Sequence, residues 1–160
     1  MDFFELVQKR HSVRKFTDEP ISSENIEAII SATQTAPSAK NTKSSAFMII
    51  EDHDTLKALS ELRTSGGKFI ADADKAIVVL GDETKTDLWR ENCSISATFV
   101  QLAATALGIG SCWVHVHGRK RSKDGSVEGM AEDYVRGLLG IKENMRILCI
   151  IALGYEASEE

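Results

Sequence analysis

Five stretches of the chain carry apolar residues at the spacing of an amphipathic helix. The longest predicted helix runs from about Glu91 to Leu107, and Gly108 would end it. Its buried face is marked by Ile95, Phe99, Leu102, Ala103 and Ala106. The other four predicted helices begin after Asp2, after Ser22 or Ser23, after Asp54 and near Met130.

Short apolar runs between these helices predict four strands. They are Ala46–Ile50, Ala76–Leu80, Ile109–Val116 and Arg146–Tyr155. GRKRSKDGSVEG, residues 118–129, is expected to be a basic loop. The helices and strands do not follow a regular β–α–β rhythm, and no repeat or linker divides the chain. We therefore predict one α+β domain over residues 1–160.

Composition narrows the classes of function. The chain has 160 residues and a net charge of −5, which argues against broad binding to nucleic acid or an anionic membrane surface. Cys93, Cys112 and Cys149 form no CxxC pair and lie in apolar surroundings, so buried, reduced thiols are expected. The N-terminus does not resemble a signal peptide, and no apolar stretch is long enough to span a membrane. A cytoplasmic location is expected.

Searches for familiar catalytic motifs give no match. The sequence has no GxGxxG after a strand, no GxxxxGK[ST] and no HExxH. His115 and His117 would point to the same side of a strand, but no third ligand accompanies them, so no metal site is predicted. No catalytic residue can be assigned from spacing. Any enzymatic chemistry is expected to come from a bound cofactor.

The segment RHSVRKF, residues 10–16, places three cations and a serine close together in an acidic chain. Arg10, Ser12 and Arg14 alternate, and alternate side chains of an extended segment lie on one side. Two guanidiniums and a hydroxyl would then converge on an anion such as a phosphate, and the residues between them would face elsewhere. The alternative is a solvated loop that follows the first helix.

Two further segments, taken together with RHSVRKF, resemble a known family. They are PSAKN, residues 37–41, and WRENCSISATFVQLAATALGIGSCWV, residues 89–114. In this order and at these separations, the three segments resemble the nitroreductase-like family of FMN-dependent oxidoreductases over nearly the whole chain. The resemblance implies an α+β fold with a central, mostly antiparallel or mixed sheet flanked by helices. It also implies a homodimer that binds FMN at its interface.

The resemblance assigns a role to each matching position. Arg10 and Ser12 would contact the FMN phosphate and ribityl chain, and His11 would touch the cofactor through its backbone. Arg14 would lie near the pyrimidine end and stabilise the reduced flavin. The remaining cofactor-binding positions form two groups. One is a loop from the second subunit, with Pro37, Ser38 and Asn41. The other is the strand that runs along the isoalloxazine, with Ser111, Cys112, Trp113 and Val114.

The chain departs from the family pattern at several points. Lys-Ser-Ser at residues 43–45 stands where many members have Gln-Pro-Trp, which affects substrate preference more than flavin binding. Asn92 stands where many short members have Asp. The tail EASEE lacks the basic residue with which many members close on the phosphate. The connection from Gly81 to Trp89 has no room for the lid insertion of larger members.

The activity implied is that of an FMN-dependent NAD(P)H oxidoreductase. NAD(P)H would deliver a hydride to flavin N5 and leave, and a nitroaromatic or quinone would then be reduced, in ping-pong order. Two alternatives stay open. One is a specialised flavin enzyme, such as a dehalogenase or an enzyme that destroys its flavin, and the other is a flavin-binding or redox-sensing protein without turnover.

Overall fold

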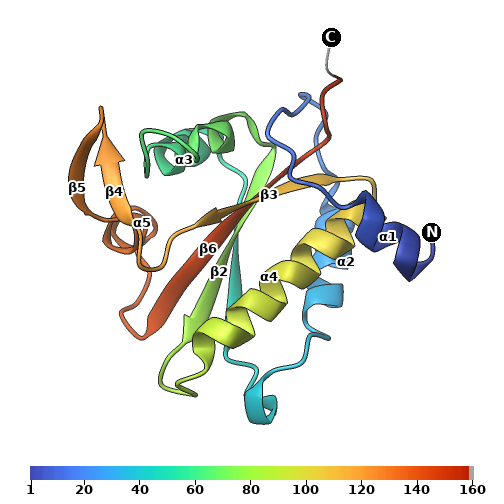
Figure 1. Ribbon diagram of the computed structural model, residues 1–160, viewed down its shortest axis with the longest axis horizontal. Helices are drawn as coiled ribbons and strands as arrows, with labels where there is room; N and C mark the ends of the chain where they lie inside the picture. The colour runs from blue at the N-terminus through green and yellow to red at the C-terminus, as the bar shows by residue number, and fades with distance from the viewer. Residues whose placement is uncertain (159–160) are drawn as a thin grey trace.

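The fold is built on a four-stranded sheet, in a computed structural model that describes residues 1–158 (Figure 1). Every neighbouring pair of strands in this sheet is antiparallel. The strands lie in the order β1 (Ser45–Ile50), β2 (Lys75–Asp82), β6 (Met145–Gly154) and β3 (Gly110–His115). The two central strands are buried along most of their length, which explains their continuous apolar sequences.

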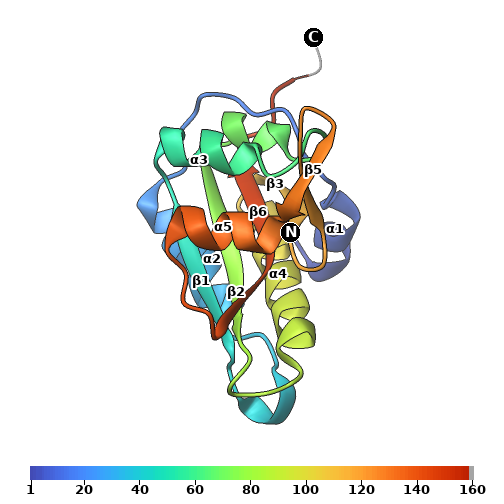
Figure 2. The same ribbon diagram turned by 90° about the vertical axis from the view of Figure 1, so that its left-hand side faces the viewer.

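Helices cover both faces of this sheet (Figures 1 and 2), and the prediction of an α+β fold is confirmed. One face carries α1 (Phe3–Lys9), α2 (Ser23–Thr33) and α4 (Trp89–Ala106). The other face carries α3 (His53–Ser60) and α5 (Ala131–Leu139). Two short 3₁₀ helices, η1 (Ala39–Asn41) and η2 (Lys68–Asp72), lie in the connections.

Alternate residues of β6 supply the two halves of the core. Ile150 and Ala152 point toward the group of buried side chains beneath α3 and α5. Ile151 and Leu153 point toward the group beneath α2 and α4. Burial on both faces therefore fixes the register of this central strand, because a slip by one residue would exchange the two sets.

Gly81 lets α4 approach the sheet closely. A Cβ atom at this position would lie 2.8 Å from Cys93 Sγ and 2.8 Å from Trp89 Cε3. A larger residue would therefore push the first two turns of α4 away from β2.

None of the described helices, which lie within residues 1–158, is both long and apolar enough to cross a bilayer.

Three predictions are corrected by the structure. The buried face of α4 is not the predicted one: Ile95, Phe99, Leu102 and Ala103 are half-buried and Ala106 is exposed. The face turned to the sheet instead carries mostly small or polar side chains, which allow close packing: Asn92, Cys93, Ser96, Ala97, Val100, Gln101 and Ala104. The helix expected to start after Asp54 is capped by Asp52, whose carboxylate accepts a hydrogen bond from the backbone N–H of Thr55 at 2.9 Å. The expected basic loop, residues 118–129, instead contains a hairpin of β4 (Lys120–Lys123) and β5 (Ser126–Met130). Its turn residues, Asp124 and Gly125, have φ angles of 51° and 80°, the left-handed conformation that a two-residue hairpin turn favours.

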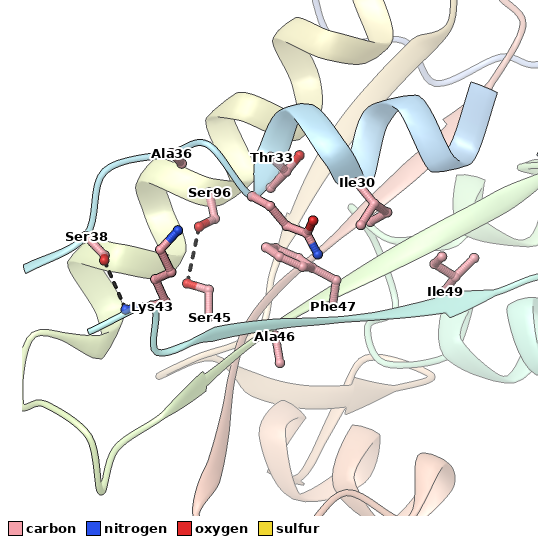
Figure 3. A pocket seen from close by; sticks show the side chains of 11 residues that line it. Ile30, Thr33, Ala36, Ser38, Lys43, Ser45, Ala46, Phe47, Ile49 and Ser96 are labelled. Atoms are coloured by element: carbon pink, nitrogen blue, oxygen red, sulfur yellow. Dashed lines mark hydrogen bonds between the residues drawn. The ribbon is translucent and has the colours of Figure 1, made fainter. Parts of the chain in front are cut away.

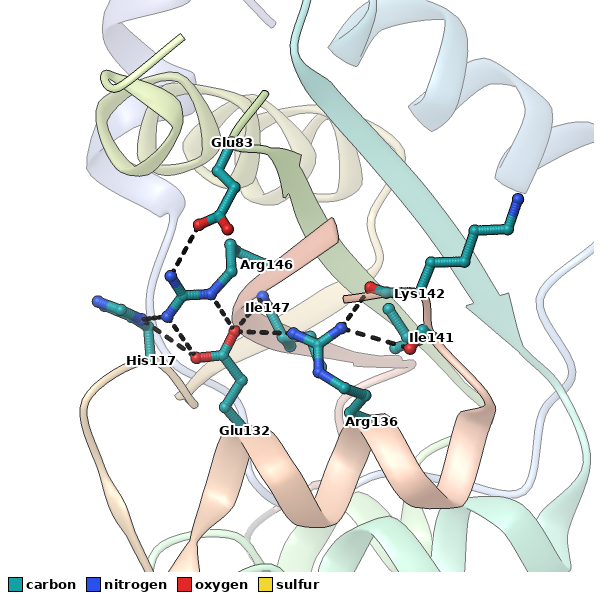
Figure 4. A network of polar contacts seen from close by, with 8 residues as sticks. All are labelled: Glu83, His117, Glu132, Arg136, Ile141, Lys142, Arg146 and Ile147. Carbon is teal, nitrogen blue, oxygen red and sulfur yellow. Dashed lines mark hydrogen bonds and ion pairs between the residues drawn. The ribbon is translucent and has the colours of Figure 1, made fainter. Parts of the chain in front are cut away.

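Glu132, in the first turn of α5, is the centre of a buried polar cluster (Figure 4). Its carboxylate accepts hydrogen bonds from Arg146 Nε at 2.8 Å, from Arg146 Nη2 at 2.9 Å and from the N–H of Ile147 at 3.0 Å. Arg146 also pairs with Glu83 at 2.9 Å and lies over the ring of Trp89, 5.1 Å from its centroid. The cluster therefore ties α5 to β6, and β6 to the start of α4.

Candidate functional site

The segment RHSVRKF runs in an extended conformation along the outer edge of β3. The N–H of Val13 donates a hydrogen bond to the carbonyl of Ser111 at 2.9 Å, and Ser12 forms a parallel bridge with Ser111. Val13 is buried against Gly110, where an added Cβ would lie 2.9 Å from the Val13 side chain. Ser12 and Arg14 are exposed on either side of the buried Val13, and His11 and Lys15 are exposed as well.

The cations of this segment are available to an anion. Arg10 is half-buried, Arg14 is exposed, and neither forms an ion pair with a carboxylate in the described chain. Ser12, Arg14 and Lys15 line a hollow of about 210 Å³, which Glu156 also lines and to which Arg10 does not contribute. The Arg14 guanidinium carbon lies 6.0 Å from the centroid of the Phe69 ring. Two guanidiniums and a hydroxyl without acidic partners match the donors that bind phosphate.

His11 is turned away from this hollow's cations and toward the C-terminal segment. Its Nε2 atom lies 3.0 Å from the carboxylate of Glu156, and its Nδ1 atom lies 2.9 Å from the carbonyl of Lys9. The hydrogen bond to Glu156, followed by that to Lys9, raises the pKa of His11 above its ordinary value. With both ring nitrogens engaged, only the backbone of His11 remains for contact with a ligand.

The four candidate residues of β3 lie directly beside the RHSVRKF segment. Ser111, Cys112 and Val114 are buried, and Trp113 is half-buried, with its Nε1 donating to His115 Nδ1 at 3.2 Å. Burial raises the pKa of the Cys112 thiol, and the charge of Arg14 and a hydrogen bond with Ser12 oppose the rise. Within residues 1–158 the buried Oγ of Ser111 has no hydrogen-bond partner. The Ser111 hydroxyl is therefore an unsatisfied polar atom at this edge that is closed off from solvent.

The loop that contains Pro37, Ser38 and Asn41 lies at the opposite end of α4. The N–H of Ala39 donates to Asn92 Oδ1 in the first turn of α4 at 2.9 Å. Thr105, in the last turn, lines a hollow together with His11 and Val13. From Asn92 to Thr105 the helix advances by thirteen positions, or about 20 Å. Within one subunit the structure therefore does not bring the loop and the RHSVRKF segment together (Figure 1).

Asn92 holds this loop in place. Its Nδ2 donates to Ser44 Oγ at 2.8 Å and to Thr42 Oγ1 at 3.3 Å, and the side chain is buried. The loop needs such support because Lys40, Asn41 and Lys43 have φ angles of 50°, 55° and 47°. Sequence reasoning noted Asn92 only as a departure from the family pattern. Its position on the buried face of a helix was the available signal.

Replacing Asn92 with Ala is expected to lower the free energy of unfolding by about 1–2 kcal/mol, because the N–H of Ala39 and the Ser44 hydroxyl lose their partner. Urea denaturation measures the loss. Thr98→Ala removes a comparable polar group from an exposed position on the same helix and should cost less than about 0.5 kcal/mol. Equal losses in the two variants would show that Asn92 does not support the loop.

A hollow of about 490 Å³ lies next to this loop, between α2 and β1 (Figure 3). Apolar side chains of both elements line it, and Ser38 and Lys43 close one end, joined by a hydrogen bond of 3.0 Å from the Lys43 N–H to Ser38 Oγ. This hollow was not predicted from the sequence. Its lining contains one cation, Lys43, whereas the RHSVRKF segment carries two guanidiniums. In the described part of the chain, no group of three His, Cys, Asp or Glu side chains is placed to bind a metal ion.

Comparison with known proteins assigns this arrangement to a family. A family model described as "Putative TM nitroreductase" matches residues 2–160. The chain belongs to the nitroreductase family. The resemblance expected from the three sequence segments is thereby confirmed.

Individual relatives are similar to this chain over most of their length. A "Putative NADH dehydrogenase/NAD(P)H nitroreductase" of Archaeoglobus fulgidus is 35% identical over 159 residues, which cover 97% of this chain and 86% of the relative. A protein of the same description from Methanothermobacter thermautotrophicus is 31% identical, covering 98% and 78%. The structure of an FMN-dependent nitroreductase from Clostridium difficile R20291 has a TM-score of 0.90 and 36% identity, covering 99% and 90%.

The residues that replace Gln-Pro-Trp in this nitroreductase have structural roles. Ser44 is buried and accepts a hydrogen bond from Asn92, and Ser45 begins β1 and accepts a hydrogen bond from Ser96 Oγ at 3.2 Å. Lys43 adopts a left-handed conformation. The substituted segment therefore closes the loop onto α4 through hydroxyl groups.

Proposed function

We propose that this nitroreductase is an FMN-dependent NAD(P)H oxidoreductase. The observation that carries the proposal is the outer edge of β3, where Ser12 bridges to Ser111 and where Arg10 and Arg14 form no ion pair within residues 1–158. This donor set fits a phosphate-bearing cofactor. The relatives named as NAD(P)H nitroreductases and the FMN-dependent structure support the same assignment.

Each part of the site would hold a different part of the cofactor. Arg10 and Ser12 would bind the phosphate, because charge-assisted hydrogen bonds from a guanidinium suit its oxygens. Arg14 would place a positive charge beside the ring system. When bound, FMN would accept a hydride from NAD(P)H and pass two electrons to an electron-poor acceptor such as a quinone or nitroaromatic, in ping-pong order. The residues of β3 would position the ring system and shield one side of it from water.

The proposed location of the protein is the cytoplasm.

The site would be completed by a second copy of the chain. Pro37, Ser38 and Asn41 lie about 20 Å along α4 from the RHSVRKF segment, so one cofactor can contact both only across a subunit interface. Three apolar side chains of α1 are also exposed, Phe3 at 61%, Phe4 at 74% and Val7 at 41%. A homodimer would cover such a surface. Light scattering of the FMN-loaded protein should give the mass of a dimer, and a monomer with FMN bound would contradict this arrangement.

Turnover tests the proposed activity. FMN-loaded protein is expected to oxidise NADH or NADPH when a quinone or nitroaromatic is present, which is followed through the loss of nicotinamide absorbance. Protein from which FMN has been removed is the control. Oxidation rates that are the same with and without FMN would refute the proposal.

Replacing Arg14 with Ala is expected to lower the reduction potential of bound FMN by about 30 mV. The reason is that a cation beside the ring system stabilises the reduced flavin, which is more negative than the oxidised one. For two electrons, 30 mV corresponds to about 1.4 kcal/mol. Potentiometric titration measures the change. Lys57→Ala removes the same charge from an exposed position on α3 and should leave the potential unchanged. An unchanged potential in Arg14→Ala would show that this residue does not tune the flavin.

A further inference from the structure

An acidic side chain lines the hollow beside RHSVRKF, where the proposed function places the cofactor phosphate. Glu156 borders this hollow of about 210 Å³ together with Ser12, Arg14 and Lys15. A carboxylate close to a phosphate is unfavourable, because two negative charges repel each other. Glu156 therefore needs a counter-charge before the hollow can bind a phosphate well.

The backbone of Glu156 is fixed in this place by the first part of the chain. Glu156 forms an antiparallel bridge with Phe16. Next to this bridge, the N–H groups of Thr17 and Ala157 donate hydrogen bonds between the two segments, at 2.8 Å and 3.0 Å. The carboxylate of Glu156 is therefore held beside RHSVRKF, and only rotation of its side chain can move it.

His11 is placed to supply the counter-charge. Its Nε2 atom lies 3.0 Å from each carboxylate oxygen of Glu156, and its Nδ1 atom lies 2.9 Å from the carbonyl of Lys9. Both ring nitrogens therefore face acceptors. A neutral imidazole has one N–H donor, whereas the protonated ring has two, so this geometry suits the charged form. The hydrogen bond to Glu156 also makes the largest contribution to raising the pKa of His11.

The other charged side chains around the pair are all cations. They are Lys9, Arg10, Arg14 and Lys15. Among the described residues that line this hollow and the neighbouring one, His11 alone belongs to the type whose charge ordinarily changes between pH 5 and pH 8. Glu156 favours the protonated form of His11, and the charge of Arg10 opposes it. The protonation of His11 therefore sets the net charge at this edge of the hollow near neutral pH.

We propose that the His11–Glu156 pair controls how tightly the enzyme binds the phosphate of its cofactor. With His11 protonated, the pair is neutral overall, and the cations of RHSVRKF can attract the phosphate. With His11 neutral, the carboxylate of Glu156 stays beside the phosphate and weakens binding. FMN affinity should therefore fall as the pH rises and His11 loses its proton. The inference rests on the proposed function, which places the cofactor phosphate beside RHSVRKF.

Fluorescence titration with FMN at about pH 6 and about pH 8.5 tests the role of His11. His11→Gln should bind FMN about fivefold more weakly than the wild type at the lower pH and equally at the higher pH, because glutamine carries no charge. His53→Gln removes an exposed histidine from the start of α3 and should match the wild type at both pH values. Each comparison is made at one pH, so the ionisation of the FMN phosphate itself cancels.

Glu156→Gln tests the other half of the pair. At about pH 8.5 it should bind FMN about fivefold more tightly than the wild type, because the repelling carboxylate is gone. Glu27→Gln removes the same charge from an exposed position on α2 and should bind FMN as the wild type does. The side chains of His11 and Glu156 are 59% and 49% exposed, so both variants are expected to fold.

Riboflavin, which lacks the phosphate, shows whether the effect acts through that group. The wild type, His11→Gln and Glu156→Gln should bind riboflavin with equal affinity at each pH. Changes as large as those for FMN would overturn the proposal. FMN affinities that do not depend on His11 or Glu156 would overturn it as well.

The failure of this inference can be told from the failure of the proposed function. Protein that binds FMN with an affinity independent of the pair would overturn the inference and leave the proposed function standing. Protein that binds no FMN at either pH would refute the proposed function. Calorimetric titration with inorganic phosphate at about pH 8.5 then tests the pair alone: tighter binding by Glu156→Gln than by the wild type supports it, and equal binding overturns it.

Discussion

Replacing Glu132 with Ala is expected to lower the free energy of unfolding by about 3–5 kcal/mol, the usual cost of removing one partner from a buried ion pair. The variant would leave the guanidinium of Arg146 with only Glu83 as a partner, and the N–H of Ile147 without its acceptor (Figure 4). Urea denaturation measures the change. Glu128→Ala breaks the pair with Arg121, in which Glu128 is exposed, and should cost less than about 1 kcal/mol. Similar losses in the two variants would show that the cluster does not stabilise the fold.

The same carboxylate should make stability depend on pH. Burial alone would raise the pKa of Glu132, but hydrogen bonds from Arg146 and Ile147, and the charge of Arg146, lower it to about 2. Because the folded-state pKa is below the unfolded value of 4.5, this stabilisation is complete above pH 4.5 and is lost as the pH falls toward 2. The loss over that range should be about 3 kcal/mol. In the Glu132→Gln variant, the loss of stability between pH 4.5 and pH 2 should be smaller by this amount. An unchanged loss would show that other carboxylates cause it.

Replacing Arg10 with Ala is expected to weaken FMN binding by about 2 kcal/mol, or roughly thirtyfold, because a charge-assisted hydrogen bond to the phosphate is lost. Asn41→Asp should also weaken binding, since it removes an amide donor from the loop without changing its size. Fluorescence titration of FMN measures both affinities. Lys57→Ala is again the control for an equal loss of charge at an exposed position. Wild-type affinity in Arg10→Ala would show that RHSVRKF does not bind the phosphate.

Mixed dimers of these two variants test whether the site spans two subunits. If Arg10 of one subunit and Asn41 of the other contact the same FMN, a dimer with one subunit of each kind has one doubly altered site and one intact site. Half of the sites should then bind FMN with wild-type affinity, although neither parent dimer does. Dimers in which no site regains that affinity would place the two residues in the same subunit's site.

Much of the fold follows from the sequence because the hydrophobic pattern and the helix caps agree with each other. Asp2 and Ser22 cap the helices that follow them, and the four apolar runs are the four strands of the main sheet. The start of α3 was misplaced because Asp52 and Asp54 are both good caps, and only the contact with Thr55 distinguishes them. The β4–β5 hairpin was missed because its strands are charged, although Asp124-Gly125 is a strong turn signal.

The candidate site was predictable to the extent that it depends on local sequence. Alternation placed Ser12 and Arg14 on one side of an extended segment, and the buried Val13 between them fixes that arrangement. Residues that matter through tertiary contacts were not predictable in this way. Asn92, for example, binds the N–H of Ala39 and the hydroxyl of Ser44, and only the packing of α4 against the loop brings these distant segments together.

A visible spectrum of the FMN-loaded protein under nitrogen, recorded before and after addition of NADH or NADPH, is the most direct test of the proposed function. The oxidised flavin spectrum should bleach on reduction and return when a quinone or nitroaromatic is added. A bound flavin that keeps its oxidised spectrum with both nucleotides would contradict the assignment as an NAD(P)H oxidoreductase.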